Sequence, residues 1–380
     1  MTTRELIMTI SSFHPTPRTL MGPGPSDVSP RVLSALGRPT IGHLDPEFVL
    51  MMDEIKSLLQ YAFQTNNELT MAVSAPGSAG METCFVNLVE PGEKVIVCVN
   101  GVFGSRMVEN VERLGAQAIV INDDWGTPVS VAKVKQAFKD NSDVKFLAFV
   151  HAETSTGVLS DAKTLCEIAR NHSALSIVDA VTSLGGVELR VDDWGIDAIY
   201  SGSQKCLSCV PGISPISFSE KAVEKLQNRQ SKVPSWFLDL SLVMGYWGGG
   251  GKRSYHHTAP VNSLYALHES LVMLQDEGLE NAWHRHDEQH QKLKKGLTKL
   301  GINFVVDEKY RLPQLNTVII PEGVDDAVVR QALLSDYNLE IGAGLGSFAG
   351  KAWRIGLMGY AARTENVTLC LAALTDVLDK

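Results

Sequence analysis

The chain has 380 residues, 44% hydrophobic and 20% charged, so it is long enough to build two domains with separate cores. Its formal net charge of −9, without a basic run, argues against nucleic acid as a partner, and no segment reaches the ~20 apolar residues of a membrane-spanning helix. Six cysteines without framework spacing, and an N-terminus without the apolar core of a signal peptide, predict a cytoplasmic protein.

The first 63 residues predict an arm, a turn and two helices. Residues 1–17 are expected to be extended, because Pro15 and Pro17 oppose a helix. Gly-Pro-Gly-Pro-Ser at 22–26 predicts a loop, after which Ser26 or Asp27 is placed to cap a helix over 30–36. Apolar residues near helical spacing predict a long helix over 46–63.

Strands and helices then alternate. Helices are expected between most strands, for example over 81–88 and 161–171. Continuous apolar runs such as Val-Ile-Val-Cys-Val at 95–99 are typical of strands covered on both faces, which predicts an α/β, doubly wound, mostly parallel sheet. Ligands of such sheets bind beyond the carboxyl ends of the strands. The expected strands are 70–74, 94–99, 117–121, 145–150, 175–179, 198–201 and 213–218.

The last hundred residues predict a second, smaller α/β domain. A helix over 261–275 is expected to close a large domain of residues 18–278. Residues 279–380 would form the small domain. Its expected elements are a polar helix over 280–300, strands near 304–306 and 317–320, a helix over 325–334, a strand at 353–355 and a last helix from residue 364.

The strongest chemical signal is an acid and a lysine at the ends of neighbouring strands. Strand 175–179 ends in Asp179, and the next strand runs into Gly-Ser-Gln and then Lys205. Such a pair is the minimum for holding pyridoxal phosphate: the lysine forms a Schiff base with the aldehyde, and the carboxylate keeps the pyridine nitrogen protonated. A surface lysine and a helix-capping aspartate are the ordinary alternatives, which the joint placement disfavours.

Other candidates follow strand ends as well. Ala-Pro-Gly-Ser-Ala-Gly at 75–80 enters a helix, where Gly77 and Ser78 could bind phosphate, although a structural turn is the alternative. His-Ala-Glu-Thr-Ser-Thr-Gly at 151–157 offers hydroxyls to a cofactor or substrate. Phe103 could stack on a pyridine ring or simply belong to the core. Arg354 could clamp a substrate carboxylate or lie on the surface.

Three further patterns are weaker. Cys206 and Cys209 form a C-x-x-C without a second ligand pair, so no metal is expected. His286 and His290 are four apart on an expected helix but lack the metalloprotease order, and they are expected on its solvated face. Gly-Leu-Gly at 344–346 lacks the context of a dinucleotide site and predicts a flexible loop.

Several ordered motifs together carry a family resemblance. Over nearly its whole length the chain resembles the class V, fold-type I pyridoxal-phosphate aminotransferases, most of all those acting on alanine and glyoxylate or on serine and pyruvate. The motifs are Gly-Pro-Gly-Pro-Ser at 22–26, Glu-Thr-Ser-Thr-Gly-Val at 153–158, Tyr-Ser-Gly-Ser-Gln-Lys at 200–205, Tyr-His-His-Thr at 255–258 and Trp-Arg-Ile-Gly-Leu-Met-Gly at 353–359.

The resemblance implies a large domain around a mostly parallel seven-stranded sheet, a smaller C-terminal α/β domain, and a role for each matching residue. Arg354 and Gly24 would bind the substrate. Tyr255 and Thr258 would reach the phosphate of the neighbouring subunit, which implies a homodimer with shared active sites. The matches to cofactor-binding positions are Lys205 for the Schiff base, Asp179 for the pyridinium, Val181 for packing on the ring, Gln204 for the phosphate and Thr154 near the ring.

Two residues depart from the family pattern. Pro76 stands in a phosphate loop that commonly reads Gly-Ser-Gly, and it lacks both a hydroxyl and a backbone donor. Phe103 stands where close relatives often have tryptophan, so the ring would be held by a smaller π-face.

The expected reaction is a ping-pong transamination from a small amino acid, alanine or serine, to a small 2-oxo acid, glyoxylate or pyruvate. The alternatives are a 2-aminoethylphosphonate–pyruvate aminotransferase and a non-catalytic binding protein on the same fold. A cysteine desulfurase is disfavoured, because residues 210–369 contain no cysteine for the late mobile loop that such chemistry needs.

Overall fold

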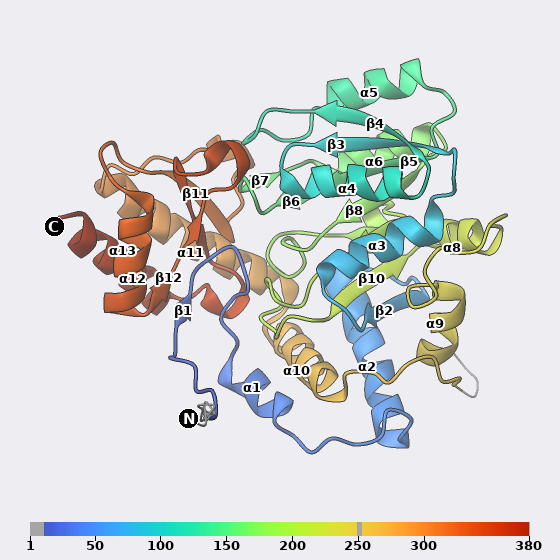
Figure 1. Ribbon diagram of the computed structural model, residues 1–380, viewed down its shortest axis with the longest axis horizontal. Coiled ribbons are helices and arrows are strands. Elements are labelled where there is room, and N and C mark those ends of the chain that lie inside the picture. Colours follow the sequence, from blue (N-terminus) through green and yellow to red (C-terminus); the bar gives the residue numbers. More distant parts are fainter. Residues whose placement is uncertain (1–10, 249–252, 380) are drawn as a thin grey trace, which may run out of the picture.

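The computed structural model describes residues 11–248 and 253–379, and its central element is a seven-stranded sheet (Figure 1). The strand order is β2-β10-β9-β8-β5-β3-β4, with β10 antiparallel to both neighbours and all other pairs parallel. The predicted mostly parallel sheet is therefore confirmed. The strands are β2 Leu69–Val73, β3 Lys94–Val99, β4 Gln117–Asn122, β5 Phe146–Val150, β8 Leu175–Asp179, β9 Ala198–Tyr200 and β10 Ser214–Phe218.

Helices cover both faces of this sheet, as its continuously apolar strands require. α3 (Gly77–Leu88) packs beside α4 (Val102–Arg113), and α5 (Val131–Asp140) packs beside α6 (Ala162–Asn171) on the other face. The buried side chains of these layers form one hydrophobic cluster. The remaining helices of this part are α1 Pro30–Leu36, α2 Pro46–Phe63, α7 Val191–Trp194, α8 Glu220–Gln227, α9 Leu240–Trp247 and α10 Val261–Glu277, and a short hairpin pairs β6 Ala152–Glu153 with β7 Val158–Leu159.

The C-terminal part is built on a second hydrophobic cluster around a three-stranded antiparallel sheet, β11-β14-β13. The N-terminal segment joins it: Met21 belongs to this cluster, and β1 (Thr19–Leu20) pairs with β12 (Leu339–Glu340), as the blue strand beside the orange elements in Figure 1 shows. The domain boundary at 278/279 stays a prediction. The other elements are α11 Leu279–Lys299, β11 Leu315–Ile319, α12 Asp326–Tyr337, β13 Gly342–Ala343, β14 Ala352–Gly356 and α13 Thr364–Leu378.

Three local expectations were wrong. Ser29, not Ser26 or Asp27, caps α1, because its hydroxyl accepts from the Val32 N–H at 3.2 Å. The helix expected from residue 81 begins four residues earlier, since Pro76 at its N-cap already has a compatible backbone (φ −65°). The strand expected at 304–306 is reduced to a single bridge between Phe304 and Val318.

The two histidines expected on a solvated face are buried instead. His286 accepts a hydrogen bond at Nε2 from the Gly359 N–H at 2.9 Å, while His290 bonds Asn316 at 2.6 Å. α11 is therefore buried along the side that carries them. Cys206 and Cys209 are buried free thiols, and no group of three or more candidate ligands that could hold a metal occurs in residues 11–248 and 253–379. Within the same residues no helix is long and apolar enough to cross a bilayer.

Candidate active site

The sequence-predicted acid and lysine meet at the carboxyl edge of the large sheet. β8 and β9 are parallel, and their register places Asp179 opposite Tyr200. The chain then turns through residues 201–204 to Lys205. Both side chains are almost fully buried, with 2% of Asp179 and 8% of Lys205 exposed.

Asp179 is held by two donors. Its Oδ1 accepts from the Val181 N–H and its Oδ2 from the Tyr200 hydroxyl, both at 2.8 Å. Burial raises the pKa of Asp179 to about 7, although these two hydrogen bonds act in the opposite direction. A cation beside this carboxyl would favour its ionised form, and a protonated pyridine nitrogen is such a cation.

We expect the cofactor-free Asp179→Asn variant to be more stable than the cofactor-free wild type, by a difference in free energy of unfolding that grows as the pH rises from 4 to 7. Folding raises the pKa of this carboxyl from 3.8 to about 7, so its contribution to stability is complete below pH 4 and is lost as the pH rises towards 7. Each unit of that shift corresponds to about 1.4 kcal/mol. Asparagine has no proton to lose, and the Tyr200 hydroxyl can accept from its amide. Urea unfolding of the cofactor-free protein from pH 4 to pH 8 measures the difference.

Asp143→Asn is the matched control. Asp143 lies in an exposed ion pair with Lys94, which lowers rather than raises the pKa of its carboxyl. This variant should gain no stability at pH 8. Parallel stability curves of wild type and Asp179→Asn between pH 4 and pH 7 would contradict the prediction.

Lys205 lies under the N-terminal segment. Its Nζ donates to the Pro23 carbonyl, and the Ser26 hydroxyl donates to the Lys205 carbonyl at 2.7 Å. Gly24 has a φ of +105°, and a Cβ on it would lie 2.5 Å from the Lys205 Nζ, so only glycine fits there. Burial, assisted by the charge of Arg354, lowers the pKa of Lys205 to about 8. The amine is therefore much easier to deprotonate than that of an ordinary lysine.

Arg354 on β14 brings a buried positive charge to the same pocket. Its Nε donates to the Ala343 carbonyl at 2.7 Å and its Nη1 to the Thr154 carbonyl at 3.2 Å. It is 7% exposed, and burial lowers its pKa to about 10. Among the ion pairs of residues 11–248 and 253–379, none includes Arg354. A guanidinium that is desolvated without a carboxylate is well suited to bind an anion.

The start of α3 lies close to two loops of the site, which carry Val181 and Gln204. A Cβ on Gly77 would lie 3.4 Å from Val181 Cγ2 and 3.6 Å from Gly202 Cα, which places the two loops in contact. The buried Oε1 of Gln204 has no hydrogen-bond partner. Pro76 is the N-cap, so the Gly77 and Ser78 N–H groups open the helix without intrahelical acceptors. The free N–H donors fit the phosphate of pyridoxal phosphate. Gln204 can contribute to such a site only through the N–H of its amide, because the amide oxygen is an acceptor.

The other predicted residues are placed differently. The Thr154 hydroxyl bonds that of Thr182, and both are buried. Phe103 is half-buried at the start of α4, with the Arg106 guanidinium 4.9 Å from its ring. Tyr255 is 63% exposed with its ring 5.4 Å from that of His43, and Thr258 is exposed. Tyr255 and Thr258 therefore do not line the pocket of their own chain.

Sequence reasoning assigned no role to two buried residues of the site, Glu153 and Tyr200. Tyr200 donates to Asp179, and Glu153 accepts a hydrogen bond from the Phe103 N–H in the first turn of α4. A signal for Glu153 was its position immediately after a strand end within the 151–157 segment. For Tyr200 the signal depends on strand register, which only the folded sheet shows.

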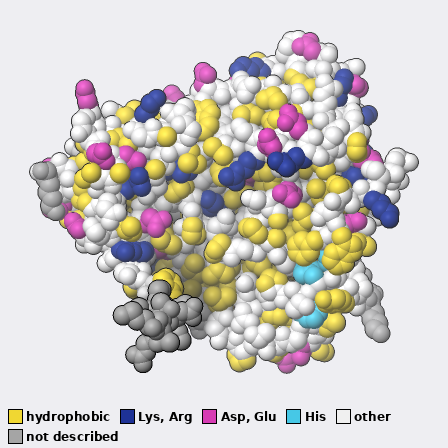
Figure 2. Space-filling model, viewed as in Figure 1, with side chains coloured by type: hydrophobic (Ala, Val, Ile, Leu, Met, Phe, Trp, Pro, Cys, Tyr) yellow, Lys and Arg dark blue, Asp and Glu magenta, His cyan; other side chains and the backbone are white. Residues whose placement is uncertain are grey.

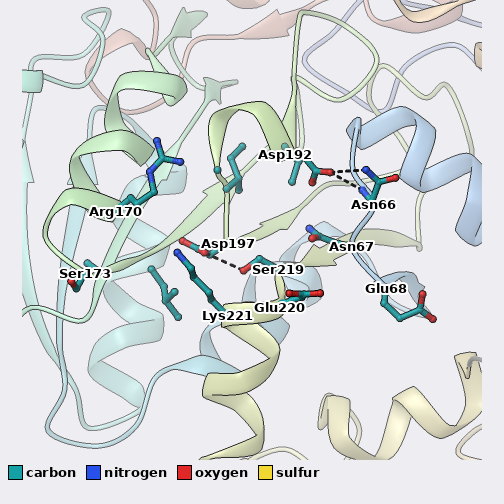
Figure 3. A pocket seen from close by; sticks show the side chains of 15 residues that line it. Asn66, Asn67, Glu68, Arg170, Ser173, Asp192, Asp197, Ser219, Glu220 and Lys221 are labelled. Atoms are coloured by element: carbon teal, nitrogen blue, oxygen red, sulfur yellow. Dashed lines mark hydrogen bonds between the residues drawn. The ribbon is translucent and has the colours of Figure 1, made fainter.

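A cleft of about 670 Å³ lies at the opposite, amino-terminal edge of the sheet (Figure 3). Two of its carboxylates already have partners: Asp192 accepts from Asn66, and Asp197 from Ser219. Neither Lys205 nor Asp179 lines it. Its position away from the carboxyl ends of the parallel strands separates it from the candidate active site.

Comparisons with known proteins identify the family of this chain. The model of the family Aminotransferase class-V matches residues 30–367. Alanine–glyoxylate aminotransferase of Rattus norvegicus is 43% identical over 363 residues, covering 95% of this chain and 87% of the relative. The structure of alanine–glyoxylate aminotransferase from Nostoc sp. superposes with a TM-score of 0.95 at 46% identity, covering 98% of both chains. The ureidoglycine–glyoxylate aminotransferase structure from Bacillus subtilis has a TM-score of 0.94 at 37% identity, covering 97% of this chain and 94% of that one.

The expected fold-type I architecture is confirmed by these structures. A family match over most of the chain, together with relatives above 40% identity, decides the assignment. The chain therefore belongs to the class V aminotransferases and is a pyridoxal-phosphate-dependent enzyme.

Proposed function

We propose that this aminotransferase moves the amino group of alanine to glyoxylate in a ping-pong reaction, with serine and pyruvate as further candidates. The observation that carries the proposal is the buried guanidinium of Arg354, which has no carboxylate partner among the described ion pairs and which lowers the pKa of Lys205. A small 2-amino or 2-oxo acid has the carboxylate that this guanidinium requires. The similarity to alanine–glyoxylate aminotransferases supports the choice of substrates.

The residues of the pocket suit the cofactor of the family. We propose that Lys205 forms the Schiff base, that Asp179 lies at the ring nitrogen and that Val181 and Phe103 pack on the ring. Gly77, Ser78 and Gln204 would hold the phosphate. When bound, pyridoxal phosphate supplies an electron-accepting ring that stabilises negative charge on the substrate Cα.

The chain's own chemistry lies mainly in Lys205. Once its Nζ is free, the neutral amine takes the proton from the substrate Cα and later returns a proton, acting as general base and then general acid. The lowered pKa of about 8 suits this role, because an ammonium could not accept the proton. Arg354 holds the substrate carboxylate, while the 22–26 segment covers the amine and restricts the access of water.

A donor-by-acceptor panel tests the proposed substrates. Alanine, serine, 2-aminoethylphosphonate and (S)-ureidoglycine are combined with glyoxylate and pyruvate, and the oxo product is measured for each pair. We expect alanine with glyoxylate to give the highest kcat/KM. A preference for 2-aminoethylphosphonate would overturn the proposal in favour of a phosphonate pocket, and a preference for ureidoglycine would assign the specificity of the Bacillus relative.

We also propose a homodimer in which Tyr255 and Thr258 reach the phosphate of the partner's site. In the single chain both are exposed, and the large apolar side chains Trp236 and Phe237 are exposed as well. The space-filling view shows hydrophobic side chains and histidines gathered over the region of α9 (Figure 2). Such exposed apolar surface is typical of a protein interface.

A cytoplasmic location is proposed too, because a reducing compartment keeps six buried thiols free.

Mixed dimers test the shared site. Lys205→Ala and Tyr255→Ala are each expected to be nearly inactive alone, because every site of either homodimer lacks one of the two residues. In a mixed dimer one site combines Lys205 from one chain with Tyr255 from the other, so activity should return on co-refolding. Activity that stays absent in purified mixed dimers would contradict the sharing of residues between subunits.

A further inference from the structure

Glu153 is a carboxylate buried beside the candidate active site, and the proposed mechanism does not use it. It lies on β6 and is 0% exposed. Its Oε1 accepts from the Ser155 N–H at 3.0 Å and from the Ser155 hydroxyl at 2.6 Å, while its Oε2 accepts from the Phe103 N–H at 3.3 Å. Both oxygens therefore act as acceptors, as in an ionised carboxylate.

The helix whose Phe103 N–H donates to Glu153 has no capping side chain of its own. α4 begins after Gly101, which has no side chain to accept from the first N–H groups. The Val102 N–H instead donates to the Ser155 hydroxyl at 3.0 Å, and the Phe103 N–H donates to Glu153. The start of α4 is thus capped from the 153–155 segment, which lies 50 residues further along the chain.

Gly101 permits this contact by its lack of a side chain. A Cβ on Gly101 would lie 2.4 Å from the Glu153 Cδ and 2.5 Å from the Ser155 Oγ, so any other residue would displace the carboxylate. The start of α4 and the 153–155 segment therefore pack closely against each other at Gly101. The first turn of α4, including Phe103, is fixed by this fit.

The charge of Glu153 also reaches the catalytic groups. Burial raises the pKa of Glu153 itself, while its hydrogen bonds act in the opposite direction. Its negative charge opposes the lowering of the pKa of Lys205 and of Arg354 and adds to the raised pKa of Asp179. No Lys, Arg or His in the described residues forms an ion pair with it within 4.0 Å. Its burial is offset by hydrogen bonds from the α4 start and from its own loop.

We propose that Glu153 is a positioning residue that holds Phe103 against the cofactor ring by capping α4 from outside the helix. The inference deepens the proposed function, since it relies on Phe103 packing on that ring. It assigns a purpose to the smaller aromatic residue: a phenylalanine with a rigidly held backbone keeps its face aligned although its area is less than that of tryptophan.

The decisive variant is Glu153→Gln. The single amide oxygen of glutamine can accept either from the Phe103 N–H or from Ser155, and its NH2 group then faces the remaining donor without a hydrogen bond. In the cofactor-free protein we expect faster amide hydrogen exchange at Phe103. On addition of pyridoxal phosphate we expect the dissociation constant to rise about tenfold. The visible circular dichroism of the bound cofactor, which reports how the ring is held, should change as well.

A double-mutant cycle with Phe103→Ala separates positioning from other effects of the charge. If Glu153 acts through Phe103, Glu153→Gln should weaken cofactor binding little in the Phe103→Ala background. Asp161→Asn is the matched control, because Asp161 is also a capping carboxylate but belongs to a different helix. It caps α6 by accepting from the Thr164 N–H, at a distance of 3.0 Å. It should leave the cofactor's dissociation constant and dichroism unchanged.

Each outcome decides the matter. Unchanged exchange at Phe103 and unchanged cofactor affinity in Glu153→Gln overturn the inference, as does an equal loss with and without the Phe103 ring. If Glu153→Gln does not fold, Ser155→Ala replaces it, because it removes the hydroxyl that accepts from the Val102 N–H and donates to Glu153. This variant is expected to show the same changes more weakly, and no change there overturns the inference too. A wild-type protein that binds no pyridoxal phosphate would refute the proposed function instead.

Discussion

Lys205→Ala is expected to lower the turnover number of transamination by roughly 10³-fold or more, because the variant loses the group that moves the Cα proton. Burial and the charge of Arg354 lower the pKa of this amine to about 8, so no ordinary solvent-exposed lysine can replace it. The fold should survive, since alanine removes a buried ammonium rather than a packed apolar side chain. Stopped-flow measurement of each half-reaction with alanine and with glyoxylate gives the rates.

The control is Lys221→Ala. Lys221 lies in the cleft at the opposite edge of the sheet (Figure 3), and its loss should leave both half-reactions at the wild-type rate. If Lys205→Ala turned over as fast as wild type, the proton-transfer role would be wrong. Rescue of Lys205→Ala by added small amines would support it, because a free amine can occupy the space of the missing side chain.

Arg354→Lys is expected to raise KM for both alanine and glyoxylate by roughly 100-fold, because loss of a buried charged hydrogen bond costs about 2–5 kcal/mol. Lysine keeps the charge, but it has no planar fork with which to bind a carboxylate while also donating to the Ala343 and Thr154 carbonyls. Steady-state kinetics of both substrates measure the effect. Arg330→Lys, in the ion pair with Asp326, is the control and should leave KM unchanged.

Arg354→Gln tests the second role of this residue, which is to lower the pKa of Lys205, separately from its binding of the substrate carboxylate. Because the Arg354 charge lowers the pKa of Lys205, removing it should move that pKa upward from about 8, whereas Arg354→Lys should move it less. The pH dependence of Lys205 labelling in the cofactor-free protein measures the shift. An unchanged Lys205 titration in Arg354→Gln would show that the two groups do not interact.

Much of this molecule follows from local sequence. The strand ending in Asp179 was predicted with its bounds because a continuous apolar run ends abruptly in a charge. Lys205 was identified because a strand and a tight polar turn place it at the same sheet edge. The class of reaction followed, since an acid and a lysine in that relation suit few cofactors.

Other features depended on contacts between distant segments. The burial of His286 and His290 comes from partners on β11 and at Gly359, which lie far along the chain from α11. The cap of α1 depended on which of three neighbouring polar residues the N-terminal segment left available, since Ser26 binds the Lys205 turn. Helical periodicity carries no information on either choice.

By itself the sequence determined the sheet, the lysine and its acid, because apolar runs and strand ends are properties of neighbouring residues. Only the tertiary structure decided how these groups are tuned and held. The close approach of Gly24 to Lys205, the lowered pKa of that lysine beside Arg354, and the capping of α4 by Glu153 each join segments more than 45 residues apart. Desolvation and hydrogen bonding across such separations depend on packing, which exists only once the chain has folded.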